Sequence, residues 1–279
     1  MQLKGNIVFI GGGAMGEAIL RRLVQGGLAP PERVTVSEPV AARRDYLKTE
    51  YGVGVEADNR AAARRASILI LAVKPQVLDK VLPDLSGILA PQTLVISIMA
   101  GVRINTLRRG LGHERIVRAM PNTPAQVGKG MTVWTATAAV DDDDKGQAQM
   151  ILAAMGDAFF VDDEHAIDLT TGLSGSGPGF VFLLVESLID AGVHIGLNRA
   201  QAERMVLQTI EGSVALLRES RAHPADLRNR VTSPGGTTAA GTLVLEQRGV
   251  RAALIEAVAA AAARSQALGD RSEASDDNI

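Results

Sequence analysis

The stretch IVFIGGGAMG, residues 7–16, decides the fold of this chain. Its first four residues are apolar and predict a short buried strand, and the pattern of residues 17–25 predicts a helix. Between the two, Gly11, Gly13 and Gly16 have the spacing G-x-G-x-x-G. In this context the first glycine permits a tight turn, the second admits a pyrophosphate, and the third lets helix and strand pack closely. The stretch therefore predicts a dinucleotide-binding domain, and a glycine-rich turn without a ligand is the alternative.

Strands and helices continue to alternate after this stretch. Further strands are predicted at residues 33–37, 67–73, 93–99, 115–119 and, as the last one, 130–137. Helices are predicted at residues 59–65 and 77–82. This order is typical of an α/β Rossmann-type doubly wound parallel sheet, whose ligands bind beyond the carboxyl ends of the strands. By that rule residues 11–16, 72–76, 99–101 and 120–122 should lie along one crevice.

The remainder of the chain has a different character. Beyond about residues 158–163 the buried-strand runs stop, and residues 178–195, 199–219, 224–230, 238–248 and 250–268 all show helical patterns. We expect residues 1–160 to form the dinucleotide-binding domain and residues 161–279 to form a helical substrate and dimerisation domain. The helices are apolar over wide arcs, which favours an oligomer over burial within one protomer.

Composition excludes several classes of function. The formal net charge of −2 argues against a nucleic-acid partner, and the absence of cysteine excludes disulfides and iron–sulfur or thiolate chemistry. Four scattered histidines lack metal-ligand spacing, so no metal site is expected. The N-terminus does not resemble a signal peptide, and the apolar run at residues 180–189 is too short for a membrane span. A cytoplasmic protein without a membrane partner is the expectation.

The end of the second strand bears on which dinucleotide is bound. Glu38 stands about 20 residues after the last glycine of the motif, where an acid would accept from the ribose hydroxyls of NAD. Ser37, Arg43 and Arg44 could instead accommodate the 2′-phosphate of NADP. The cofactor is therefore NADPH or NADH, and we favour NADPH.

A second candidate site is the stretch VTSPGGTTAAG at residues 231–241, between two predicted helices. Ser233, Thr237 and Thr238 surround its proline and glycines. Hydroxyl groups and free N–H groups at a helix start can bind a carboxylate, and the alternative is an ordinary turn with a threonine cap.

With these segments identified, the chain resembles the pyrroline-5-carboxylate reductases. The resemblance covers nearly the whole chain through FIGGGAMGEAI (9–19), LAVKPQ (71–76), SIMAG (97–101), RAMPNTPA (118–125), LSGSGP (173–178), DAGV (190–193), VTSPGGTT (231–238) and VLEQRG (244–249). It implies NAD(P)H-dependent reduction of the C=N bond of 1-pyrroline-5-carboxylate to L-proline, the last step of proline synthesis. It also implies a dimer, with a decamer of dimers as a larger assembly.

The resemblance also implies roles for individual residues. The pyrophosphate would be held by Gly11, Gly13, Ala14, Met15 and Gly16, with Asn59 near the adenosine and Ala72, Val73, Lys74 and Pro75 along the cofactor. Ala100, Gly101, Met120 and Asn122 would flank the nicotinamide and the substrate. Ser233, Gly235, Gly236, Thr237 and Thr238 would bind the carboxylate and ring nitrogen, with Thr238 as the catalytic hydrogen-bonding group. Lys74 could approach the phosphates or only hold its Lys-Pro-Gln turn.

Two rival functions remain at this stage. A reductase of another imine acid or a β-hydroxyacid dehydrogenase would share the layout, but the dehydrogenase needs a lysine that residues 172–219 lack. A redox sensor that binds NAD(P) without turnover is the other rival.

Two departures from the family pattern are Gly179 after GSGP and Asn229 before VTSPGG, and we assign Asn229 no catalytic role.

Overall fold

The computed structural model describes residues 3–274, which divide into two compact units. The first, called the sheet unit, is made of the described parts of Met1–Ser176 and Ala260–Ile279. The second, called the helical unit, is Gly177–Ala259.

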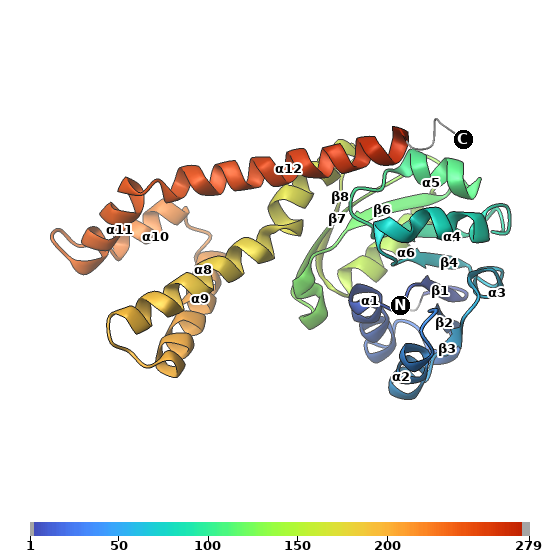
Figure 1. Ribbon diagram of the computed structural model, residues 1–279, viewed down its shortest axis with the longest axis horizontal. Helices are drawn as coiled ribbons and strands as arrows, with labels where there is room; N and C mark the ends of the chain where they lie inside the picture. Colours follow the sequence, from blue (N-terminus) through green and yellow to red (C-terminus); the bar gives the residue numbers. More distant parts are fainter. Residues whose placement is uncertain (1–2, 275–279) are drawn as a thin grey trace. The chain divides into compact units, whose positions relative to one another are not determined.

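The sheet unit contains eight strands in the order β3-β2-β1-β4-β5-β6-β7-β8 (Figure 1). The strands are β1 Ile7–Ile10, β2 Val34–Ser37, β3 Gly54–Glu56, β4 Ile68–Leu71, β5 Leu94–Ser97, β6 Ile116–Met120, β7 Gly130–Ala136 and β8 Gly156–Phe160. Strands β1 to β6 are parallel, and β1 pairs with β2 on one side and β4 on the other. The strand order therefore reverses beside β1, which places the ligand crevice at the carboxyl ends of β1 and β4.

One strand of the sheet is not parallel to its neighbour. β7 runs antiparallel to β6, with Met120 paired to Val133, and β8 then runs parallel to β7. The connection from Met120 to Gly130 holds only the short helix Thr123–Val127 (η3), so it is too short for a crossover and returns as a hairpin. The predicted doubly wound sheet is confirmed, with this one antiparallel addition.

Two strands were not predicted from the sequence. β3 has three residues, none of them buried, and in β8 only Ala158 is buried. Neither strand has the continuous apolar run that marks β4 or β5. For that reason β8 was missed, and the prediction that residues 130–137 form the last strand is wrong.

Alternate residues of the strands form two apolar cores, one on each face of the sheet. Ile7 and Phe9 face the core covered by α1 (Ala14–Gln25), α2 (Ala41–Tyr51) and α6 (Asp142–Ala153). Val8 and Ile10 face the core covered by α3 (Asn59–Ala63), α4 (Leu78–Leu85) and α5 (Ile104–Leu111). Burial on both faces explains why β1 is apolar at every position.

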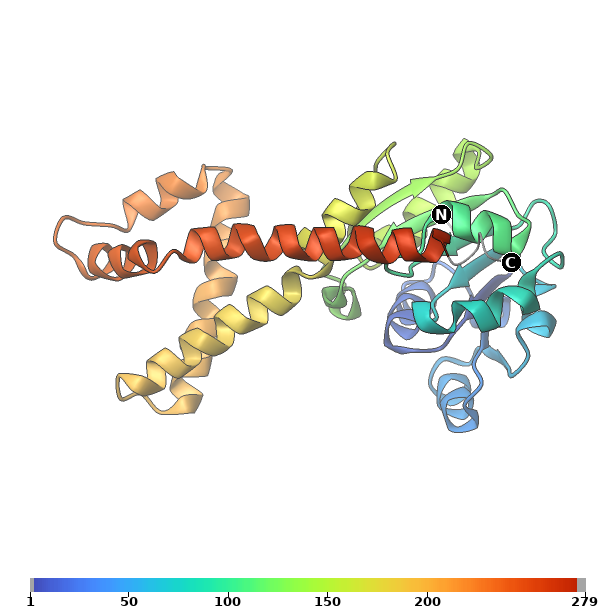
Figure 2. The same ribbon diagram turned by 45° about the horizontal axis from the view of Figure 1, so that its top comes forward.

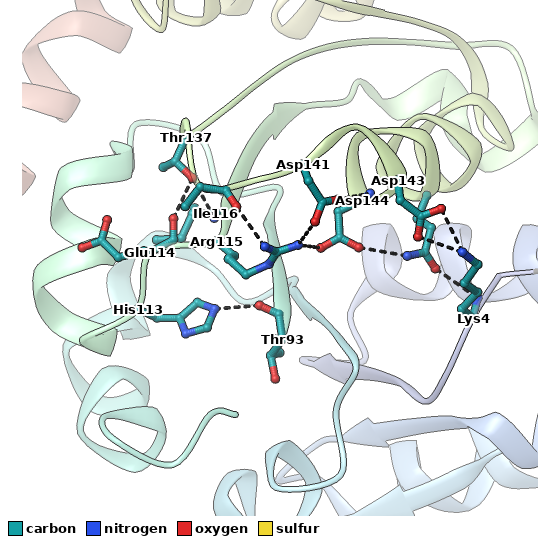
Figure 3. Close-up of polar contacts among 12 residues, drawn as sticks. Lys4, Thr93, His113, Glu114, Arg115, Ile116, Thr137, Asp141, Asp143 and Asp144 are labelled. Carbon is teal, nitrogen blue, oxygen red and sulfur yellow. Dashed lines mark hydrogen bonds and ion pairs between the residues drawn. The ribbon is translucent and has the colours of Figure 1, made fainter. Parts of the chain in front are cut away.

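The acidic run DDDDK begins α6. Asp141 is its N-cap and accepts the N–H of Asp144 at 2.9 Å. Figure 3 shows Arg115 donating to Asp141 at 2.7 Å and also to Asp144. This acidic run stabilises the helix start, because negative charge near a helix N-terminus is favourable.

A buried arginine connects three elements of the sheet unit. Arg118 on β6 is 1% exposed and donates to Glu164 and to Asp168 on α7 (His165–Thr170), both at 2.8 Å. Ser265 on α12 (Val250–Ala274) donates to the same Asp168 at 3.2 Å. Arg118 lies two residues before the carboxyl end of β6, so this network holds the strand that leads into the crevice.

The helical unit exposes most of its apolar side chains. It contains α8 (Gly177–His194) and α9 (Arg199–Ser220), which pack against each other (Figure 2), followed by α10 (Pro224–Arg230) and α11 (Thr237–Gln247). Within Gly177–Ala259, all of which the structure describes, Ala202 is the one buried residue. Large exposed apolar residues include Phe182, Leu183 and Ile255. So little burial cannot stabilise such a unit alone, which implies a second apolar surface that covers it.

The helix His165–His194 is 30 residues long. Among residues 3–274, His165–His194 is the one continuous helix that could cross a membrane by length and composition alone. The apolar run at residues 180–189 is therefore part of a longer helix than the sequence predicted.

Candidate active site

The glycine-rich turn after β1 has three glycines that are required for different reasons. Gly11 has φ of +101°, and a Cβ there would lie 2.8 Å from the carbonyl oxygen of Ala72. A Cβ on Gly16 would lie 2.6 Å from the carbonyl oxygen of Gly11. Gly13 is the N-cap of α1, and a Cβ there would meet nothing within 4 Å. The fold itself requires Gly11 and Gly16, whereas the open space at Gly13 is a cradle that a pyrophosphate would fill.

Two adjoining pockets extend from this turn along the carboxyl ends of the strands. The first, of about 490 Å³, is lined by Gly11, Gly13, Ser37, Glu38, Pro39, Ala57, Asn59, Ala72, Val73, Lys74, Val77, Lys80, Val81 and Asp84. The second, of about 390 Å³, is lined by Gly13, Ala14, Met15, Ala72, Val73, Lys74, Pro75, Ile98, Met99, Ala100, Met120, Pro121, Asn122, Thr123 and Gly175. Gly13 and the segment after β4 line both, so the two pockets form one elongated crevice that suits a dinucleotide.

The first pocket has the polar groups expected around an adenosine ribose. The hydroxyl of Ser37 donates to Asn59 Oδ1 at 2.7 Å, and Asn59 Nδ2 donates to Asp84 at 3.0 Å. Glu38 accepts the N–H of Gly12 at 3.0 Å. Each of these groups is held by at least one neighbour, so the pocket is preorganised.

The ion pair between Arg43 and Glu17 stabilises the glycine-rich turn. Arg43 on α2 donates to Glu17 on α1 and, at 2.7 Å, to the carbonyl oxygen of Gly12. Burial alone would raise the pKa of Glu17, but hydrogen bonds from Tyr51, Arg43 and Tyr46 outweigh it and lower that pKa. Glu17 therefore stays ionised and keeps Arg43 against the glycine-rich turn.

The second pocket is shaped by an asparagine that bridges two loops. Asn122 Nδ2 donates to the carbonyl oxygen of Ser174 at 3.0 Å, and its Oδ1 accepts the N–H of Met131 at 2.9 Å. These bonds fix the segment after β6 against the π-helical turn Thr171–Gly175 (η4). Met120 and Gly175 meet at this point, since a Cβ on Gly175 would lie 2.9 Å from Met120 Cε.

Most of the predicted cofactor residues lie in the crevice, and two lie behind it. Gly16 packs against Gly11 as described, and Gly101 packs under α12, where a Cβ would lie 2.8 Å from Leu268 Cβ. Neither glycine lines either of these two pockets. Lys80, Asp84 and Gly175 line the crevice without having been predicted. Gly175 belongs to the LSGSGP motif at residues 173–178, so the sequence contained a motif from which this site residue could have been predicted.

The hydroxyl-bearing loop in the helical unit forms a tight turn that opens a helix. The N–H of Gly236 donates to the carbonyl oxygen of Ser233 at 3.0 Å, and Gly235 has φ of +69°. Gly236 is the N-cap of α11 without a side-chain cap, so Thr238 is not the cap. Thr237 and Thr238 occupy the first helical turn, whose N–H groups have no intrahelical acceptor and are suited to an anion.

Comparison with known proteins connects this geometry to a chemistry. Residues 164–268 match the family described as pyrroline-5-carboxylate reductase dimerisation, and residues 6–101 match the family described as NADP oxidoreductase, coenzyme F420-dependent. The first match covers the exposed apolar helices, including the whole of the long helix His165–His194. Because the matched region is a dimerisation region, the exposed apolar faces of these helices are assigned to self-association.

Relatives match over nearly the full length of the chain. A pyrroline-5-carboxylate reductase of Synechocystis is 50% identical over 262 residues, which is 94% of this chain and 97% of the relative. The solved pyrroline-5-carboxylate reductase of Coxiella burnetii has a TM-score of 0.87 and 38% identity, covering 95% of this chain and 98% of that one. The pyrroline carboxylate reductase of Plasmodium falciparum, solved with NADP bound, has a TM-score of 0.88 and 33% identity, covering 96% and 100%.

Proposed function

This chain belongs to the pyrroline-5-carboxylate reductase family, and we infer that it reduces the C=N bond of 1-pyrroline-5-carboxylate to L-proline with NAD(P)H. This reaction is the final step of proline biosynthesis. The observation that carries the inference is a full-length relative at 50% identity, together with a crevice whose glycine turn has space for a pyrophosphate.

We assign dinucleotide binding to the predicted residues that line the two pockets and to Gly16 and Gly101, which lie behind them. They are Gly11, Gly13, Ala14, Met15, Gly16, Ser37, Asn59, Ala72, Val73, Lys74, Pro75, Ala100, Gly101 and Asn122. The bound cofactor supplies hydride to the imine carbon. We assign Met120 to the reacting ring, and Asn122 supports it by fixing the loop at Met120.

For the substrate, we assign the carboxylate to Ser233, Gly235, Gly236 and Thr237, and the ring nitrogen to Thr238. The turn geometry supports this assignment because it leaves the N–H groups of the first turn of α11 without intrahelical acceptors. Thr238 holds the nitrogen by a hydrogen bond, and no stronger acid is assigned to this step. Catalysis then depends mainly on positioning.

The enzyme self-associates as a dimer through the helical region, and we propose a decamer of dimers as the larger assembly. We also propose that residues 1–160 bind the dinucleotide and residues 161–279 bind substrate and dimerise. The proposed location is the cytoplasm. Light scattering after size-exclusion chromatography tests the assembly, and a dimer alone would contradict the larger form.

Oxidation of NADPH and NADH in the presence of 1-pyrroline-5-carboxylate tests the reaction. We expect turnover that depends on the substrate. Nucleotide binding without turnover of either cofactor would instead support the redox sensor.

Thr238→Ala tests the catalytic assignment. Thr242→Ala is the matched control, because it removes a hydroxyl one turn further along α11 that donates to the Thr238 carbonyl at 2.7 Å. We expect Thr238→Ala to lower kcat by at least about tenfold with cofactor affinity unchanged, since one hydrogen bond at the reacting group is lost. Equal kcat values for the two variants would remove Thr238 from the mechanism.

A further inference from the structure

We propose that Glu38 is a specificity-determining residue that favours NADH by disfavouring the 2′-phosphate of NADPH, which reverses the preference for NADPH expected from the sequence. The proposal rests on the proposed function, because it names which form of the cofactor the same crevice accepts. It follows from the position of one carboxylate and from the groups that surround it.

The carboxylate of Glu38 is fixed at the end of β2, directly beside the glycine-rich turn. One of its oxygens accepts the N–H of Gly12 at 3.0 Å, and the other accepts the N–H of Val40 at 3.1 Å. A Cβ on Gly12 would lie only 3.4 Å from the Glu38 carboxylate. The side chain also lines the first pocket, so it cannot turn away without losing two backbone hydrogen bonds.

A carboxylate held in this way discriminates between the two cofactors. An ionised carboxylate is only an acceptor, with about four lone-pair positions, and two of them remain for the ribose hydroxyls of NADH. A 2′-phosphate would bring negative charge and further acceptors to the same place.

Both arginines that could offset this charge already donate to groups of the protein itself. Arg43 donates to Glu17 and to the carbonyl oxygen of Gly12. Arg44 donates through one nitrogen to the carbonyl oxygens of Glu38 at 2.7 Å and Pro39 at 2.9 Å. Both guanidinium groups therefore hold the turn around Glu38 in place.

The remaining charges of the pocket do not favour a phosphate either. Its lining residues include two acids, Glu38 and Asp84, and two lysines, Lys74 and Lys80, so their formal charges cancel. The Ser37 hydroxyl, which could donate to a phosphate, already donates to Asn59.

The experiment measures kcat/KM for NADPH and for NADH, with 1-pyrroline-5-carboxylate, in wild type, Glu38→Gln and Glu56→Gln. Glu56 is the matched control: it lies on β3, where it is paired with Ser37 of β2, and it lines neither of the two pockets. We expect wild type to favour NADH and Glu38→Gln to raise the NADPH/NADH ratio by at least about tenfold, as expected for removing one charge close to a phosphate. Glu56→Gln should leave the ratio unchanged.

Calorimetric titration of both nucleotides into the same three proteins separates this proposal from the proposed function. If no protein turns over substrate, the reaction is wrong, but the ratio of the two dissociation constants still tests Glu38. A ratio that changes less than about threefold in Glu38→Gln, or that changes equally in Glu56→Gln, overturns the proposal.

Discussion

The buried pair of Arg118 and Asp168 gives the sharpest test of how the sheet unit is held together. The perturbation is Asp168→Asn, which removes the charge of a side chain that is 2% exposed and keeps its shape. Arg118, which is 1% exposed, would then keep Glu164 as its one hydrogen-bonded acid among the described residues.

The expected cost follows from the burial of both partners. Removing one member of a buried ion pair leaves an uncompensated charge and typically costs about 3 to 5 kcal/mol. We expect about 3 kcal/mol, the lower limit, because Glu164 still pairs with Arg118. For a chain of this size that loss lowers the melting temperature by about 6 °C or more.

Thermal unfolding at one fixed protein concentration measures the effect, because association contributes to the stability of an oligomer. Glu164→Gln is the control: its side chain is 31% exposed, and the loss should be no more than about 1 kcal/mol. Melting temperatures that agree within about 2 °C between the two variants would refute the idea that Arg118 depends on Asp168.

Three further predictions concern other residues and are measured as nucleotide affinity or as stability. Gly13→Ala should weaken NAD(P)H binding by at least about tenfold and leave the melting temperature unchanged, because its Cβ meets only the space for the ligand. Gly156→Ala should destabilise the fold by about 3 kcal/mol, because φ is +142° and the Cβ would lie 2.2 Å from the Gly130 carbonyl oxygen. The hydrogen bond from Arg115 lowers the pKa of Asp141 from its ordinary value of 3.8. The stability difference between wild type and Asp141→Ala should therefore be largest above about pH 4 and shrink as the pH falls further; a pH-independent difference would contradict this.

The sequence predicted those parts of the fold whose signal is local. Strands β1, β4 and β5 are buried on both faces, so each is an unbroken apolar run that can be recognised without neighbours. β3 and β8 lie at the two edges of the sheet, where one side lacks a partner strand and residues are more exposed. Their pairing depends on strands far away in sequence, which no local pattern reports.

The same distinction applies to the site. The glycine turn and the segments after β4, β5 and β6 were predicted because the carboxyl ends of parallel strands meet at one edge. Lys80 and Asp84 come from α4, and they reach the pocket only because of how that helix packs on the sheet. The hydrogen bonds of Ser37, Arg43 and Arg44 are likewise tertiary contacts, so the preference for NADPH expected from the sequence could not take them into account.

The three motif glycines show how a structure can separate folding from function within a single pattern. At Gly11 and Gly16 the added carbon would strike backbone of the chain itself, so both glycines would be needed even by a protein that bound nothing. At Gly13 the backbone is extended at φ of −68° and ψ of −178°, a conformation open to any residue, and the added carbon would meet no atom within 4 Å. Neither strain nor packing accounts for glycine there. A ligand that approaches the backbone at the start of α1 does account for it, and the residue therefore indicates a bound phosphate more directly than the rest of the motif.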